Sequence, residues 1–160
     1  MAKYKTYKHI KAIAQDDRNG CWSASMAWWT KAVPTISNYT DDEIMVEYSH
    51  LRATNGGLTF PDGFRQMLSD PKWGMTVEVT TSSYFAFEWI KTGLKKAPVM
   101  LGFWDSRVGG HHAVVVHDYS SHITTGSVVT YMDPNGGYHQ TRPGLWSMGM
   151  GRSIIVGYLK

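Results

Sequence analysis

The sequence contains a single cysteine, Cys21, among its 160 residues. One cysteine cannot form an internal disulfide, and secreted domains of this size often carry paired cysteines. A chain of this length buries roughly 70% of the surface that its unfolded form exposes, so its core needs no disulfide or metal. We therefore expect the protein to work in a reducing compartment, where a reactive thiol stays reduced.

Charge and long apolar runs are also scarce. Charged residues make up 18% of the chain and hydrophobic residues 42%, which excludes a disordered protein. The net charge is only +3, and no basic run goes beyond Lys95 and Lys96, so we expect no nucleic-acid partner. No apolar stretch approaches the ~18 residues that a membrane span needs. The basic N-terminus lacks the apolar core of a signal peptide, so we expect no membrane partner and no ordinary secretion signal.

The sequence shows no internal repeat, low-complexity tract or linker, so we predict one domain over residues 1–160. Periodicity and capping signals predict helices mainly in the first half, beginning at Cys21, after Thr40, near Pro61 and after Ser82 or Ser83. Alternating or continuously apolar runs predict strands at 73–80, 98–104, 112–119, 127–133 and 153–159. Helices followed by strands indicate an α+β fold, with helices packed on a mostly antiparallel sheet.

Cys21 opens the first predicted helix, whose apolar positions Trp22, Met26, Trp29 and Val33 fall on one face and predict an amphipathic helix. A cysteine attacks as the thiolate, and a helix N-terminus or a nearby imidazolium favours that form. A lone cysteine is more often a buried structural residue. The residues around this one favour a nucleophile instead.

Three further residues supply the remaining roles of thiol-based acyl transfer. Gln15 lies six residues before Cys21 in a polar, turn-prone segment, where its amide could stabilise an oxyanion together with the Cys21 N–H. His112 opens an apolar strand after two glycines and is our candidate general base; Asp133 ends the next strand and is our candidate orienting residue. His111 and His112 point to opposite faces of a strand, so only one can face the cysteine, and His111 stays open as the alternative base.

Metal and cofactor sites are not expected. The histidines from 111 to 122 are close in sequence, but no cysteine pair or helical histidine spacing accompanies them. The paired glycines at 56–57 and 136–137 lack the strand-to-helix setting of a phosphate loop. We therefore predict an enzyme without a metal or another cofactor.

With these residues in place, the chain resembles the papain-like cysteine peptidases. The resemblance rests on Gln15 spaced from Cys21 and Trp22, on His112 followed by Ala113 and Val114, and on Asp133 before Pro134. It implies a papain-like fold with the nucleophile at the start of the first helix. It also implies that Gln15 is the oxyanion donor, Cys21 the nucleophile, His112 the acid and base, and Asp133 its orienting partner.

Among papain-like proteins, the chain is most similar to compact bacterial members: peptidases that remove double-glycine bacteriocin leaders, and papain-fold effector toxins. The resemblance implies a cysteine endopeptidase with a protein substrate, acting in the cytoplasm or delivered by a specialised secretion system into a target cell. A delivered toxin would also require a cognate inhibitor protein in the producing cell. The alternative is an amidase, deamidase or acyltransferase that uses the same residues on a side-chain amide or a non-protein substrate, including peptidoglycan.

Overall fold

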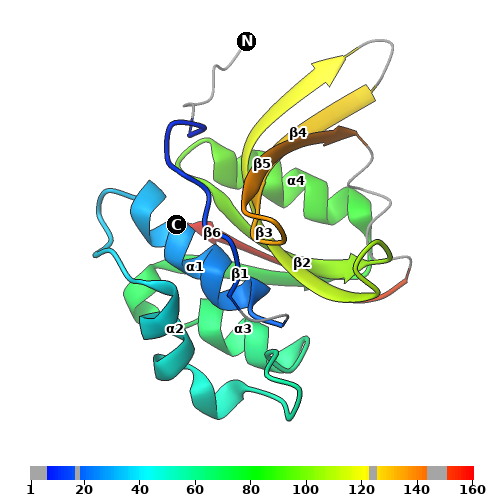
Figure 1. Cartoon of the computed structure of the whole chain (residues 1–160). Coiled ribbons are helices and arrows are strands. Elements are labelled where there is room, and N and C mark those ends of the chain that lie inside the picture. Colours follow the sequence, from blue (N-terminus) through cyan, green and yellow to red (C-terminus); the bar gives the residue numbers. More distant parts are fainter. Residues whose placement is uncertain (1–6, 17–18, 123–125, 144–150) are drawn as a thin grey trace.

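The structure is a computed structural model that describes residues 7–16, 19–122, 126–143 and 151–160 (Figure 1). Its α-helices are α1 (Cys21–Ala32), α2 (Asp41–Glu47), α3 (Asp62–Leu68) and α4 (Ser83–Leu94), with short 3-10 turns at Ser49–Leu51 and Pro71–Trp73. Its strands are β1 (Met75–Thr80), β2 (Val99–Asp105), β3 (Gly110–His122), β4 (Gly126–Asp133), β5 (Tyr138–Pro143) and β6 (Ile154–Leu159).

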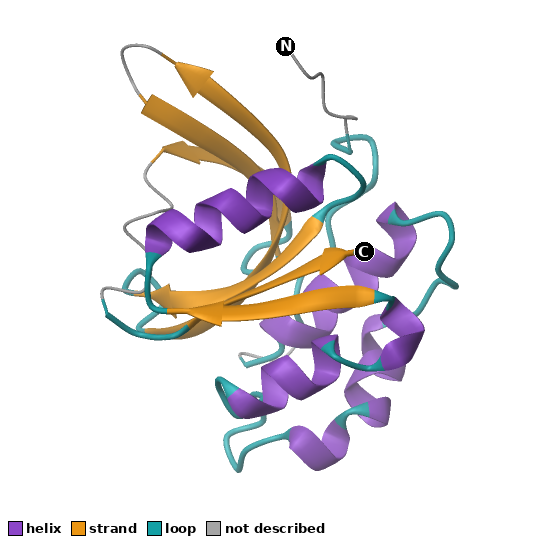
Figure 2. Ribbon diagram, turned by 180° about the vertical axis from the view of Figure 1, so that it is seen from behind, coloured by secondary structure: helices purple, strands orange, loops and turns teal. Residues whose placement is uncertain are grey.

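The described strands form one sheet in the order β1-β6-β2-β3-β4-β5, and every pairing in it is antiparallel. Helices cover both faces of this sheet: α1, α2 and α3 lie on one side, and α4 crosses the other (Figures 1 and 2). The α+β class predicted from the sequence is confirmed. Within the described residues, no helix combines the length and the apolar character needed to cross a bilayer.

Helix α1 begins at Cys21, as the sequence predicted, but its burial is not confined to one face. Every residue from Trp22 to Thr30 is buried, as is Ala32. The helix lies between the sheet, α2 and the N-terminal segment, whose Ile10 carbonyl accepts a hydrogen bond from the Trp28 indole. Because α1 has neighbours on several sides and only Lys31 is fully exposed, the single apolar stripe underestimated its burial.

Helix α4 covers a second, separate core. Ser82 caps its N-terminus, because the Ser82 side chain accepts a hydrogen bond from the Phe85 N–H. Its buried residues Ala86, Ile90 and Leu94 pack against apolar side chains from β2, β3, β4 and β6. The sheet thus has a packed apolar layer on each face, which fixes the strands that carry the candidate site.

Strand β5 was not predicted from the sequence. Its residues Tyr138–Pro143 carry no Val, Ile, Leu or Met side chain, and they follow the glycine-containing turn after β4. The strand forms because β4 offers a complete antiparallel edge, from Asp133 opposite Tyr138 to Val128 opposite Pro143. Pairing with a neighbour, rather than local preference, therefore determines this strand.

Candidate active site

Cys21 occupies the first position of α1 and is partly exposed. The first N–H groups of a helix have no partner within the helix, and the positive end of its dipole favours an anion there. One turn further along, the buried Ser25 hydroxyl donates a hydrogen bond of 3.0 Å to the Ala113 carbonyl of β3. That bond ties the helix of the cysteine directly to the strand of the histidine.

His112 is buried at 4% exposure and lies opposite Phe103 of β2. Its Nε2 is 2.8 Å from Oδ1 of Asp133, which is also buried. A carboxylate can only accept, so Nε2 carries the proton and Nδ1 is the nitrogen left for the Cys21 thiol. The structure therefore brings Cys21, His112 and Asp133 together in the arrangement that the sequence suggested.

The charge state of His112 follows from these neighbours. Burial alone lowers the pKa of His112, but hydrogen bonds with Asp133 and with Cys21 outweigh burial and raise it to about 9. An imidazolium between a carboxylate and a thiol is therefore favoured at neutral pH.

Asp133 accepts two further hydrogen bonds, from residues that no sequence motif marks. The Asn135 N–H donates to Oδ1 at 3.0 Å, and the Gln140 amide donates to Oδ2 at 2.9 Å. Gln140 was not predicted because it lies on β5, the strand that the sequence analysis missed. The alternation of Tyr138, Gln140 and Arg142 is the signal that could have indicated this strand and placed Gln140 beside the strand of Asp133.

Gln15 lies at the same site, held through its backbone. Its N–H donates a 2.9 Å hydrogen bond to the carbonyl of Pro134, the residue after Asp133. The preceding residue, Ala14, packs against Gly137, whose φ of +70° and close approach leave no room for a Cβ. One turn after β4 therefore positions both Asp133 and the segment of Gln15.

His111 lines the same cavity as Cys21 and His112, but its ring packs among aromatic side chains. Its ring stacks on Phe60 at 4.0 Å between centroids and meets Trp104 edge-on at 5.3 Å. Arg152 in turn lies over the Trp104 ring at 3.8 Å. Burial, with the nearby Arg152 charge, lowers the pKa of His111. Of the two adjacent histidines, His112 is thus the one that interacts with Cys21 and Asp133.

Cys21, His112 and Gln15 all line a cavity of about 750 Å³. Gly109 and Gly110 form part of its wall, and a Cβ at either position would meet nothing within 4 Å. The described lining includes the Arg107 guanidinium and no carboxylate. Within the described part of the chain, no cluster of three or more His, Cys, Asp or Glu side chains is arranged to hold a metal ion.

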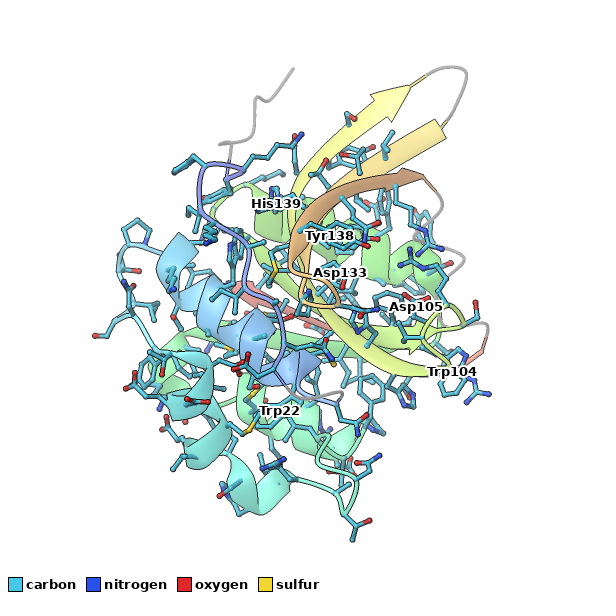
Figure 3. All side chains as sticks on the ribbon, viewed as in Figure 1. Trp22, Trp104, Asp105, Asp133, Tyr138 and His139 are labelled. Atoms are coloured by element: carbon cyan, nitrogen blue, oxygen red, sulfur yellow. The ribbon has the colours of Figure 1, made fainter. Side chains whose placement is uncertain are left out.

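An ion pair between the buried Asp105 and the partly exposed Arg107 shapes the hairpin on one side of this cavity. Asp105, at 3% exposure, accepts hydrogen bonds from the backbone and the guanidinium of Arg107, and Arg107 also donates to the Tyr131 hydroxyl at 3.3 Å. Burial acts to raise the pKa of Asp105, but its hydrogen bonds with Arg107 lower it below the usual range. Figure 3 shows Asp105 and Trp104 near the end of β2, with Asp133 on the neighbouring part of the sheet.

No protein-family model matches the sequence, and neither does any curated protein sequence. The fold, however, is similar to the solved structure of UfSP from C. elegans, with a TM-score of 0.54 and 15% sequence identity. That match covers 99% of this chain and 35% of UfSP, so this chain spans about a third of its length. At this identity the likeness shows the fold alone, and the two proteins share an α+β arrangement.

Proposed function

We propose that the protein is a papain-fold cysteine endopeptidase that hydrolyses peptide bonds of protein substrates. The single observation that carries this proposal is that His112 interacts with both Cys21 and Asp133. The thiol of Cys21 lies at a helix N-terminus and lines a cavity of about 750 Å³. A buried histidine held by a carboxylate and interacting with an accessible thiol is what nucleophilic catalysis by cysteine requires.

The proposed reaction has two halves. His112 Nδ1 takes the proton of Cys21, and the thiolate attacks the substrate carbonyl carbon to form a tetrahedral oxyanion. The Cys21 N–H and the Gln15 side chain stabilise that oxyanion. When it collapses, the C–N bond breaks, His112 gives its proton to the leaving amine, and Cys21 holds the acyl group as a thioester. His112 then deprotonates a water molecule, whose oxygen attacks the thioester; the C–S bond breaks, the carboxylic acid product leaves, and His112 returns the proton to the Cys21 thiolate. Asp133 keeps Nε2 protonated and the ring oriented throughout.

The test is a comparison of new protein N-termini in a lysate treated with the protein or with its Cys21→Ala variant. The proposal predicts N-termini that appear only with the cysteine present. Their flanking residues would define the cleavage preference. Equal sets of N-termini from the two proteins would contradict peptidase activity at this site.

The same test separates proteolysis from the alternative function, an acyl-transfer reaction on another kind of amide. The same three side chains would serve an amidase or a deamidase. Cys21-dependent release of ammonia from glutamine side chains, or of fragments from peptidoglycan, without new N-termini would favour that function. The cavity lining, with Arg107 and no carboxylate among its described residues, is compatible with either substrate.

The cellular setting is a separate part of the proposal. A reduced thiol suits the cytosol, either of the producing cell or of a target cell that receives the protein as an effector toxin. Expression of the chain in a bacterial cytosol tests this point. Growth arrest that requires Cys21 would support the toxin role, and normal growth of cells that contain folded protein would contradict it.

A further inference from the structure

The Asp133 carboxylate is held from two sides. Oδ1 accepts from His112 Nε2 at 2.8 Å and from the Asn135 N–H at 3.0 Å, and Oδ2 accepts from the Gln140 amide at 2.9 Å. Gln140 is the one side chain other than His112 that donates to Asp133 among the hydrogen bonds of the described residues. Asp133 is 3% exposed, so its partners must come mainly from the protein.

The sheet register explains how Gln140 reaches this carboxylate. Asp133 lies opposite Tyr138 on β5, and Gln140 lies opposite Tyr131. Gln140 is therefore the diagonal neighbour of Asp133 on the same face, a spacing that a long side chain can bridge. The turn between the strands contributes the Asn135 N–H, so β4, the turn and β5 together surround the carboxylate.

A carboxylate held only through Oδ1 can rotate about its Cβ–Cγ bond. Without a donor at Oδ2, that buried oxygen would be unsatisfied and the group would gain by turning toward another donor. Rotation would exchange the oxygen facing His112 and disturb the imidazole that faces Cys21. We propose that Gln140 is a positioning residue of the active site, which acts on the Cys21–His112 pair through Asp133; this inference rests on the proposed function.

The first test is Gln140→Leu, which keeps the size of the side chain and removes the donor. Its expected effect is a fall in kcat of about tenfold, the value of a hydrogen bond to a charged group, with little change in KM. The rate of Cys21 alkylation by iodoacetamide at about pH 6 should also fall, because the His112 imidazolium faces the thiol in a smaller fraction of the molecules. Arg142→Gln is the matched control on the same strand, and it should retain both rates.

The second variant, Gln140→Glu, gives a signature that a structural role would not produce. A glutamic acid donates a hydrogen bond to Asp133 only while it is protonated. Relative to wild type at each pH, its alkylation rate should therefore be close to normal near about pH 5 and decline toward about pH 8. Circular dichroism at each pH would establish that the compared samples are folded.

The outcomes separate this inference from the proposed function. Rapid alkylation of wild type, together with equal kcat and alkylation rates in Gln140→Leu and Arg142→Gln, would overturn the role of Gln140 and leave the peptidase proposal standing. A pH-independent ratio for Gln140→Glu would overturn it as well. Slow alkylation of wild type, at the rate of an ordinary thiol, would overturn both proposals.

Discussion

At the scale of single residues, the charge on His112 is the property with the clearest consequence. The ring is buried, yet its hydrogen bonds with Asp133 and Cys21 raise its pKa to about 9. An unfolded histidine has a pKa of about 6.5. Between these two values the folded protein binds one more proton at this position than the unfolded chain does.

This difference predicts how stability depends on alkaline pH. The contribution of His112 is fully present below about pH 6.5 and is lost as the pH rises through about 9, because the raised pKa favours the protonated folded state. Urea unfolding of wild type and His112→Gln across this range measures it. The stability advantage of wild type should shrink as the pH rises. A constant difference between the two proteins would contradict the raised pKa.

The sequence suggested four of the residues that lie at the site, but not all of them. The sequence pointed to Cys21, His112 and Asp133 because their side chains are reactive or titratable and each lies at the boundary of a predicted element, and to Gln15 because of its spacing from Cys21. Gln140 and the Asn135 N–H could not be identified from the sequence, because their importance comes from the contacts they make with Asp133. Contacts of that kind depend on strand register, which the sequence did not specify.

At the scale of elements, the bond between α1 and β3 sets the distance between nucleophile and base. The Ser25→Ala variant removes the buried hydrogen bond to the Ala113 carbonyl, and should cost about 1 kcal/mol of stability and lower kcat. Ser23→Ala is a matched control, because the Ser23 hydroxyl is equally buried but bonds within the helix start, to Gly20. Equal loss of kcat in both variants, measured on one peptide, would contradict a role for this link.

The turn after β4 gives a second prediction for an element. A Cβ at Gly137 would lie 2.7 to 2.9 Å from atoms of Ala14, so Gly137→Ala should displace the segment that carries Gln15. We expect a lower kcat/KM on peptides with Cys21 alkylation retained, because only the peptide reaction forms an oxyanion. Gly151→Ala is the control, since Gly151 also has a positive φ but nothing within 4 Å. Equal kcat/KM in the two variants would contradict this role.

The helices and most strands were predictable because each carries its own local signal. The Thr40 and Glu43 side chains form the capping box that the sequence indicated before α2, and the apolar runs mark the central strands. The position of β6 was not predictable, because the last strand in the chain inserts between β1 and β2. Nothing in residues 154–159 specifies their partners, which are set by the sheet as a whole.

At the scale of the whole molecule, a pair of histidines fastens the N-terminal segment to the sheet. His139 Nε2 donates to the Ile10 carbonyl at 2.9 Å, and His139 Nδ1 shares a hydrogen bond of 3.0 Å with His117 Nε2. Figure 3 shows His139 and Tyr138 above Asp133 in that view. The segment that leads to Gln15 is therefore anchored by this pair of histidines.

This anchor predicts sensitivity to acid. Burial, with the nearby charges of His139 and Lys8, lowers the pKa of His117 to about 3. As the pH falls, the unfolded chain takes up a proton on His117 at a higher pH than the folded protein does. The contribution of the neutral His117 ring to stability is therefore present above about pH 6.5 and is lost as the pH falls toward 3. Urea unfolding of wild type and His117→Gln should show a steeper decline with falling pH in wild type. Parallel curves would contradict the prediction, and exposed His50→Gln serves as the control.

The measurement that tests the central claim most directly is the rate of Cys21 alkylation as a function of pH, followed by mass spectrometry in wild type and in His112→Ala. A thiolate paired with the His112 imidazolium should react rapidly even at about pH 6, well below the usual thiol pKa of about 8.5. Loss of the imidazole should move the reaction to alkaline pH. Equal profiles in the two proteins, both rising only near about pH 8.5, would contradict the assignment of Cys21 and His112 as a catalytic pair.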